Sequence, residues 1–340
     1  MSNTAPYFLP SNQFDHFYRG GDRIGALRNG PGGPMRPEEW IGSSTTRFGE
    51  KSSGLSTLPT GTLLRDAIEN DPQGWLGADL VAHSGSSSEI LVKLLDPAQR
   101  LPVHFHPNKA FAKKHLALNH GKTEAWIILE APAGARVGLG FKETMSKQSV
   151  NEMVSARDSK GLLDSLDRFE VHAGDTVLVP AGVPHAIDSG IFVLELQEPT
   201  DLSALLEWEG FAVDGEKDGH LGVGFDTVLD ALRYTPVDDK SSLLTSSGLT
   251  GGEQRSLLAT SADGYFRADL LPGSGEVSPS FTVVLVLENE GVLKTVQGDQ
   301  LAVTRGDALV IPFNSGGFSL SGATAVACRP PLPSLAELSE

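Results

Sequence analysis

The amino-acid sequence predicts a mainly β protein made of two similar β-domains. Its 38 glycines and 21 prolines are dispersed along 340 residues, which is typical of many turns between short strands. The segments "GDTVLVPAGVPHAI", from Gly174, and "GDALVIPFNSGGFSL", from Gly306, share a Gly-Asp turn, an apolar stretch and a proline. This weak repeat indicates the same turn and buried strand in both halves. Only the first copy carries a histidine, His185, where the second has Gly317.

The first part of the chain is expected to combine turns, short helices and two strands. Residues 1–60 are rich in turns, because "RNGPGGPMRPEEW" holds too many prolines and glycines for a helix. Residues 61–77 have helical periodicity, and Pro72 is expected to end that helix. The next expected elements are a core strand over 87–96, an alternating strand over 100–108 and a short helical insertion over 109–120.

The middle of the chain is expected to return to strands and then to reach a domain boundary. The expected elements are a strand pair over 124–141, a partly helical stretch over 142–168, a strand–turn–strand unit over 169–199 and a helix over 226–234. The Ser/Gly-rich segment 240–254 is the best candidate boundary, and only short strands are expected after it. The predicted division is a first domain over 1–212 with an N-terminal extension and helical insertions, a linker with a short helix over 213–255, and a second domain over 256–340.

Composition excludes several classes of protein. The formal net charge of −16 argues against a nucleic-acid backbone or an anionic membrane as the main partner. The sequence shows neither an apolar stretch long enough to span a membrane nor the pattern of a signal peptide, so a cytoplasmic protein is expected. A single cysteine, Cys328, excludes an internal disulfide framework, and its apolar context predicts a buried thiol.

Three histidines and one glutamate form the candidate metal site. His104 and His106 are separated by one residue, so on a strand both imidazoles share a face. Glu124 begins an apolar strand, and His185 ends the Gly-Asp motif of the first domain. Three imidazoles and one carboxylate suit zinc, and also Mn, Fe, Co or Ni, with positions left for water or substrate.

Three further residues are candidates for contact with a ligand. Lys122 precedes Glu124 by two residues and therefore faces the same side of a strand, with a solvated lysine at the strand edge as the alternative. Trp40 is a candidate to line the ligand pocket, with a core position as the alternative. Lys109, after "HPN", is a candidate substrate contact, with simple surface exposure as the alternative.

At these residues the sequence resembles the type I mannose-6-phosphate isomerases of the cupin superfamily. The segments that carry the resemblance are "YRGG" (18–21), "EEWIGS" (38–43), "LVKLLDPAQRLPVHFHPNKAFAKKH" (91–115), "GKTEAWIIL" (121–129), "VPAGVPHAI" (179–187) and "ELQEPTD" (195–201). The resemblance implies two cupin-type jelly-roll barrels, the second without metal. It also implies an aldose–ketose isomerase with a divalent metal, usually zinc, that interconverts mannose 6-phosphate and fructose 6-phosphate through a cis-enediol.

The family's metal ligands, Gln, His, Glu and His, fall on His104, His106, Glu124 and His185, so the first ligand is changed from Gln to His. Lys122 and Asp201 match active-site positions of the family, and the resemblance implies catalytic roles for both, with Lys122 as an acid–base group or a phosphate contact. Because the resemblance implies a sugar substrate, Trp40 is a candidate to stack on a sugar ring. The partner implied is a small sugar or sugar phosphate, bound by a monomer or a homodimer, with no role for nucleic acid or membrane.

A second departure concerns the substrate. The family places an essential arginine at the position that Leu205 occupies here, and a leucine neither stabilises an enediolate nor contacts a phosphate. An isomerase or epimerase for an unphosphorylated or different sugar is therefore an alternative, as is a sugar-binding cupin without catalytic activity. A cupin oxygenase that uses iron in the His-rich site is a further alternative.

Overall fold

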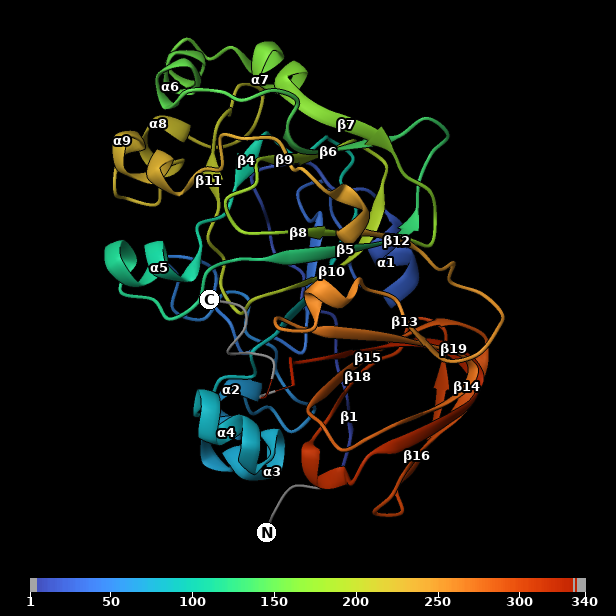
Figure 1. Cartoon of the computed structure of the whole chain (residues 1–340). Helices are drawn as coiled ribbons and strands as arrows, with labels where there is room; N and C mark the ends of the chain where they lie inside the picture. Colours follow the sequence, from blue (N-terminus) through green and yellow to red (C-terminus); the bar gives the residue numbers. More distant parts are fainter. Residues whose placement is uncertain (1–4, 333, 335–340) are drawn as a thin grey trace.

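The computed structural model describes residues 5–332 and residue 334, and its strands form three antiparallel sheets (Figure 1). The prediction of a mainly β protein is confirmed. Two of the sheets build the half of the molecule that holds the candidate metal site. The third sheet lies beside them and contains most of the C-terminal residues (Figure 1).

The first two sheets supply the candidate ligands from opposite sides. The six-stranded sheet has the order β12-β8-β5-β10-β3-β2. Its strands are β2 (Glu38–Ile41), β3 (Leu91–Leu95), β5 (Glu124–Glu130), β8 (Asp175–Val179), β10 (Phe192–Gln197) and β12 (Leu244–Ser246). The five-stranded sheet has the order β11-β4-β9-β6-β7. Its strands are β4 (His104–Phe105), β6 (Arg136–Phe141), β7 (Leu166–Glu170), β9 (His185–Ile187) and β11 (Ala204–Leu205).

The third sheet joins the two ends of the chain. Its strands are β1 (Tyr7–Phe8), β13 (Arg255–Ser256), β14 (Arg267–Val277), β15 (Thr282–Glu288), β16 (Glu290–Thr295), β17 (Gln300–Thr304), β18 (Ala308–Ile311) and β19 (Phe318–Arg329). The N-terminal strand β1 pairs with β18, so the start of the chain folds with the C-terminal sheet. The expectation of short strands only after 256 was wrong for β14 and β19, which have 11 and 12 residues. These two strands pair with each other through a register shift that absorbs Gly273.

The helices are short and lie outside the sheets (Figure 1). They are α1 (Arg23–Arg28), α2 (Leu64–Asn70), α3 (Pro72–Leu76), α4 (Ala78–Ser84), α5 (Lys109–Phe111), α6 (Lys147–Ser155), α7 (Ser159–Ser165), α8 (Gly215–Asp218) and α9 (Phe225–Val228), with single turns η1 (Ala112–Leu116), η2 (Leu229–Ala231), η3 (Lys240–Ser242), η4 (Thr260–Ala262) and η5 (Phe313–Ser315). Pro72 ends α2 as expected but also begins α3, because the Asp71 side chain accepts a hydrogen bond from the Gly74 amide. No helix in the described part of the chain is long and apolar enough to cross a membrane.

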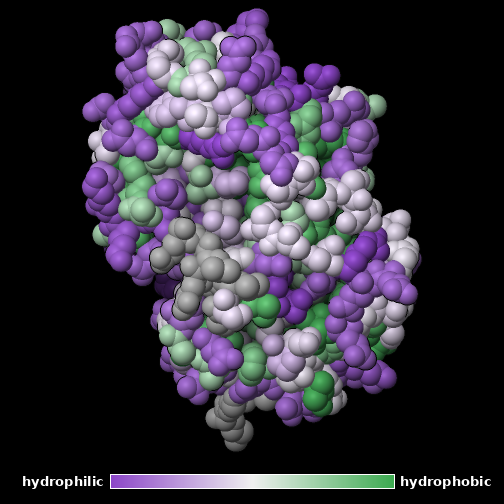
Figure 2. Space-filling model, in the orientation of Figure 1, coloured by the Kyte–Doolittle hydropathy of each residue, from purple (hydrophilic) through white to green (hydrophobic). Residues whose placement is uncertain are grey.

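A continuous hydrophobic core links the two halves of the molecule. It contains Trp126 of the six-stranded sheet and Phe266 and Val283 of the C-terminal half. Cys328 belongs to this core and is fully buried, as predicted. A separate core lies around Phe105 and Phe141 and packs the five-stranded sheet against the helices. Hydrophilic side chains cover much of the outer surface, with hydrophobic side chains scattered between them (Figure 2).

The Gly-Asp turns of the two repeats have the same backbone conformation. Gly174 and Gly306 have φ of +90° and +91°, which is strained for any residue with a Cβ atom. A Cβ on Gly174 would lie 2.5 Å from Gly248 Cα, and one on Gly306 would meet the Leu27 carbonyl oxygen. We therefore expect Gly174→Ala and Gly306→Ala each to lower the free energy of unfolding by more than about 1 kcal/mol.

Urea denaturation of the two variants measures this loss. The matched control is Gly134→Ala, which also has a positive φ of +76° but has no atom within 4 Å of the added Cβ. Its loss is expected to be smaller, because only the backbone strain remains. Equal losses in all three variants would show that the close contacts of the repeat glycines contribute nothing.

Candidate metal centre

Three imidazoles converge between the two smaller sheets. His104 on β4 and His185 on β9 are direct partners in the strand register, and His106 follows two residues after His104. One ring nitrogen from each histidine lies within 4.8 Å of the others, and all three side chains are buried. The prediction that these histidines share one site is confirmed.

The hydrogen bonds of the three rings fix which nitrogen faces the centre. The Nδ1–H of His104 donates to the Pro102 carbonyl at 2.8 Å, that of His106 to Leu202 at 2.6 Å, and that of His185 to Val183 at 2.9 Å. A carbonyl only accepts, so each Nε2 of a neutral ring carries a lone pair. The Nε2 atoms of His104 and His185 are nevertheless 3.0 Å apart. Two lone pairs at this distance fit a cation between them.

The surroundings favour the neutral, ligating form of each ring. Burial is the main cause, and it lowers the pKa of His106 and His185 to about 3. Burial and the neighbouring His185 also hold the pKa of His104 well below its ordinary value. Because the imidazoles are uncharged at neutral pH, no proton has to leave them before a metal binds.

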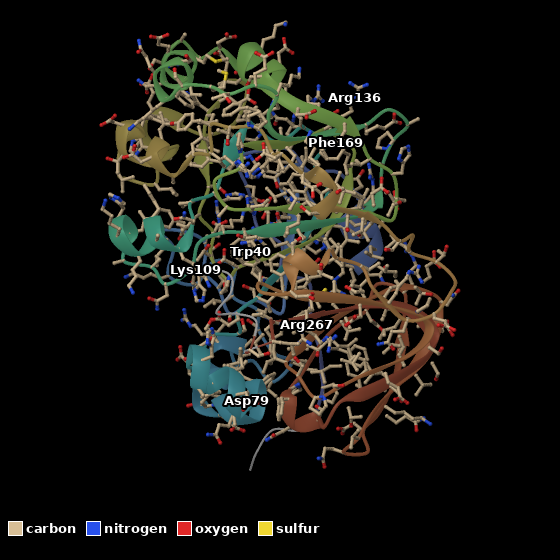
Figure 3. The ribbon with its side chains drawn as sticks, viewed as in Figure 1. Trp40, Asp79, Lys109, Arg136, Phe169 and Arg267 are labelled. Atoms are coloured by element: carbon tan, nitrogen blue, oxygen red, sulfur yellow. The ribbon has the colours of Figure 1, made fainter. Side chains whose placement is uncertain are left out.

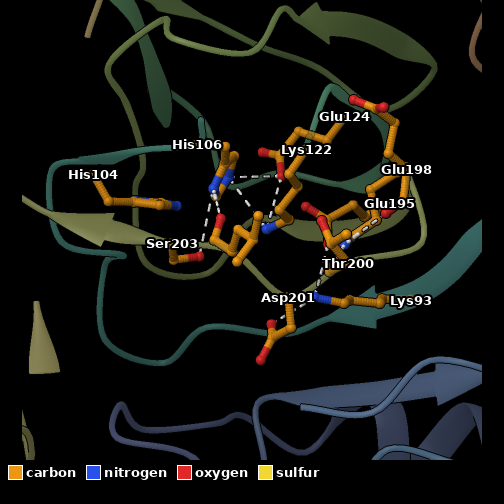
Figure 4. Close-up of polar contacts among 12 residues, drawn as sticks. Lys93, His104, His106, Lys122, Glu124, Glu195, Glu198, Thr200, Asp201 and Ser203 are labelled. Carbon is orange, nitrogen blue, oxygen red and sulfur yellow. Dashed lines mark hydrogen bonds and ion pairs between the residues drawn. The ribbon is translucent and has the colours of Figure 1, made fainter. Parts of the chain in front are cut away.

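Glu124 approaches the histidines from the opposite sheet (Figure 4). Its two carboxylate oxygens lie 3.0 Å from His106 Nε2 and 3.3 Å from His185 Nε2. The Lys122 ammonium lies 3.1 Å from the same carboxylate and 3.2 Å from His106 Nε2. Trp126 Nε1 donates to Oε1 of Glu124 at 2.9 Å, and the buried Oε2 has the Lys122 ammonium as its ion-pair partner. A buried carboxylate beside three imidazole lone pairs is the donor set expected for a divalent ion.

A second charged cluster lies beside this centre. The buried Lys93 ammonium on β3 is 3.5 Å from Glu38, 3.7 Å from Glu195 and 3.8 Å from Asp201. It also lies 4.5 Å from the centre of the Trp40 ring. Burial opposes the charge on Lys93, but the three carboxylates outweigh it and raise the pKa above its usual value. Lys93 therefore stays charged and holds the carboxylates together.

Glu195 and Glu38 differ in the direction of their pKa shifts. Burial and the charge of Glu124 raise its pKa to about 8. In contrast, Glu38 stays ionised, because His16, Lys93 and hydrogen bonds from Trp40 and Tyr18 overcome its burial and hold its pKa far below the ordinary value. The site thus contains a proton-carrying carboxyl beside ionised ones, an arrangement common to acid–base centres.

A cavity of about 870 Å³ opens onto these groups, a volume suited to a small ligand. Its described lining includes four of the residues predicted for the site, namely His104, Lys122, Glu124 and Asp201. Leu205 also lines the cavity, directly opposite His104 in the strand register. His106 and His185 are not among the described lining residues, but they belong to the same candidate metal centre as His104.

Trp40 and Lys109 were also predicted at the site, and neither is among the described residues that line the cavity. Trp40 is fully buried, because Phe14, Gly54 and Lys93 pack against its ring (Figure 3). Lys109 begins α5 and its charge acts on Glu89 and Glu198 instead (Figure 3).

Sequence reasoning missed three groups of the site. His16 was not among the predicted site residues, yet its side chain is 5% exposed, lines the cavity and lies 3.6 Å from Glu38. Lys93 and Glu195 were not singled out. Their signal in the sequence is a charged residue in the middle of an apolar strand, in "LVKLL" and "FVLELQ". A buried charge of this kind needs a partner, and the β3–β10 register places the two opposite each other.

The chain is similar to known sugar isomerases. The mannose-6-phosphate isomerase of Streptococcus mutans is 31% identical over 251 residues, which cover 72% of this chain and 75% of that protein. The crystal structure of the mannose 6-phosphate isomerase from Bacillus subtilis covers 96% of this chain with a TM-score of 0.73 and 21% identity. A mannose 6-phosphate isomerase structure solved with zinc and yttrium has a TM-score of 0.71 and 17% identity. No family model matches the chain.

Proposed function

The chain belongs to the mannose-6-phosphate isomerase family, and we propose that it is a metal-dependent isomerase that interconverts mannose 6-phosphate and fructose 6-phosphate. The observation that carries this proposal is the convergence of three neutral imidazoles and one buried carboxylate beside the cavity. Ionisable side chains that could transfer protons, namely Lys122, Glu195 and Asp201, line the same cavity and favour catalysis over binding alone.

We assign the four ligands of the metal to His104, His106, Glu124 and His185. The Nε2 atoms of the histidines and a carboxylate oxygen of Glu124 are the donors. Zinc is the favoured ion, with Mn, Fe, Co and Ni as alternatives, since a set of three imidazoles and one carboxylate suits all of them. When bound, such an ion would act as a Lewis acid toward the oxygens of the sugar.

The chain's own groups move the protons. Aldose–ketose isomerisation transfers one proton between C1 and C2 and one between the two oxygens. Glu195 lines the cavity, and its raised pKa suits a group that takes up and returns a proton near neutral pH. The Lys122 ammonium stays beside Glu124 and is placed to stabilise negative charge on a sugar oxygen. Asp201 is held by Lys93 and by the Phe48 amide at 3.1 Å, and we assign it to a sugar hydroxyl or to proton transfer.

The C-terminal residues complete the proposed architecture. We propose that 1–212 form a catalytic cupin domain and that 256–340 form a second cupin-like domain without metal, joined by 213–255. Two strands cross this division, because β1 pairs with β18 and β12 pairs with β8. The matching turns at Gly174 and Gly306 support the second domain, as does Gly317, which has no side chain to offer where His185 stands in the first. In the described part of 256–340 there is no group of three residues able to hold a metal like that of the histidine centre.

The proposal is tested with purified protein, stripped by a chelator and reloaded separately with Zn, Mn, Fe, Co or Ni. Isomerisation is followed from mannose 6-phosphate and from fructose 6-phosphate, with free mannose and free fructose in parallel. We expect activity in both directions on the phosphosugars, lost on chelation and restored by at least one metal. Activity on free sugars alone would favour the alternative substrate, and metal binding without turnover of any sugar would favour a binding module. Oxygen uptake with iron and another substrate would indicate an oxygenase.

A further inference from the structure

The position at which the family carries an arginine is Leu205, so the cavity needs other cations to hold the phosphate of a phosphosugar. We propose that Arg47 and Lys217, at the mouth of the cavity, form that phosphate site. This inference rests on the proposed function, because it assumes a phosphosugar whose reacting end faces the metal centre.

The cations of the cavity fall into two pairs. Four described lysines and arginines line it: Arg47, Lys93, Lys122 and Lys217. Lys93 and Lys122 are buried and already paired with carboxylates at 3.1–3.8 Å. Arg47 and Lys217 have no carboxylate of the described residues within ion-pair distance, so their charges are free for a ligand. A phosphate carries nearly two negative charges at neutral pH and is matched by two such cations.

Arg47 is held beside the polar groups of the cavity. Its guanidinium stacks on Phe14, 5.4 Å from the ring centre, and makes one long hydrogen bond of 3.4 Å to the Asp15 carbonyl. His16 lines the same cavity, and its pKa is lowered mainly by burial, with a smaller contribution from the Arg47 charge. The amide of the next residue, Phe48, donates to Asp201. The loop that carries Arg47 is therefore fixed to a residue at the site, and the flat guanidinium keeps most of its donors for an anion.

Lys217 lies on a segment that is fastened to Leu205 itself. The Leu205 amide donates to the Gly219 carbonyl at 2.8 Å, at the end of α8. The start of α8 packs closely against Trp208, because a Cβ on Gly215 would lie 2.0 Å from the indole ring. These two contacts hold α8 over β11. Lys217 on this segment thus provides the positive charge that the family pattern provides with an arginine at position 205.

The metal centre and the free cations lie in different parts of the cavity, so each would contact a different end of the substrate. The metal centre lies at the inner end of the cavity, where Glu124 is 2% exposed, whereas Lys217 is exposed at the mouth. Three exposed carboxylates, Glu50, Asp214 and Asp218, also line the mouth. These carboxylates repel a dianion. The two free cations, Arg47 and Lys217, are therefore necessary for a dianion to bind at the mouth.

The test compares wild-type protein with Arg47→Gln, Lys217→Gln and the double variant. The matched control is Lys294→Gln, an exposed lysine on β16 of the C-terminal sheet. KM and kcat are measured for mannose 6-phosphate and for any free sugar that the wild type turns over, and binding of inorganic phosphate is measured by calorimetry. For each single variant we expect KM for the phosphosugar and Kd for phosphate to rise about tenfold or more, because a charge-assisted contact is lost. The kcat value, the free-sugar kinetics and the control variant should not change.

The outcomes separate this inference from the proposed function. If the wild type isomerises mannose 6-phosphate but the variants keep its KM and its phosphate affinity, the phosphate site is elsewhere and the proposed function stands. An equal rise in KM for free and phosphorylated sugars would also contradict the inference, since it would indicate a disturbed cavity. If the wild type turns over only a free sugar and does not bind phosphate, both proposals fail.

Discussion

Replacing His185 with alanine is expected to weaken divalent-metal binding by at least about tenfold and to remove isomerase activity, because the ion loses one of its four proposed ligands. His185 is fully buried and its Nε2 lies 3.0 Å from His104 Nε2 and 3.3 Å from Glu124. No described neighbour is placed to substitute for it as a nitrogen donor. Metal affinity is measured by competition with a chelator of known affinity, and occupancy by elemental analysis.

The control for this variant is His83→Ala, which removes an exposed histidine on α4. Far-UV circular dichroism shows whether His185→Ala keeps the native fold. A second informative variant is His104→Gln, which restores the residue that the family pattern places there and keeps a ligating oxygen. We expect it to retain more metal than His104→Ala. Full occupancy of His185→Ala at wild-type affinity would contradict the assignment of the ligands.

Replacing Lys93 with methionine is expected to lower the free energy of unfolding by about 3–5 kcal/mol, the cost of leaving buried charges without their partner. Lys93 is 2% exposed and is the shared partner of Glu38, Glu195 and Asp201. Methionine has a similar length and keeps the packing on Trp40, so the loss reports the charge rather than a cavity.

Urea denaturation measures this effect as a lower midpoint at an unchanged m-value. The matched control is Lys294→Met on the exposed surface of β16, for which little change is expected. A midpoint for Lys93→Met equal to that of the wild type would show that the three carboxylates do not depend on Lys93. Since these carboxylates line the cavity, the Lys93→Met protein that remains folded should also have reduced activity.

The sequence was sufficient to group the four residues of the candidate metal centre, because each has a local signal. His104 and His106 alternate along one segment, Glu124 begins an apolar strand, and His185 follows a recognisable turn. The structure brings these segments together through register: β4 places His104 opposite His185, and β5 brings Glu124 within 3.3 Å of it. The mainly β character also followed from the dispersed turns.

The residues that sequence reasoning missed depend on contacts between distant strands. Lys93 is opposite Glu195 on one side and Trp40 on the other, and no spacing along the chain reveals that row. For Trp40 the sequence left open a sugar contact or a core position, and its pairing opposite Lys93 places it in the core. His16 lies in a turn-rich segment, and only the fold shows that this segment closes one side of the cavity. The pairing of β1 with β18 was equally invisible in the sequence.

The most direct test of the central claim is kcat/KM of the zinc-loaded protein for mannose 6-phosphate, measured before and after removal of the metal. For a dedicated enzyme, we expect a value of about 10⁴ M⁻¹s⁻¹ or more, lost on chelation and recovered on addition of metal. A value near zero for the fully loaded, folded protein, together with efficient turnover of a free sugar, would contradict the proposed substrate and show that Leu205 marks a different specificity.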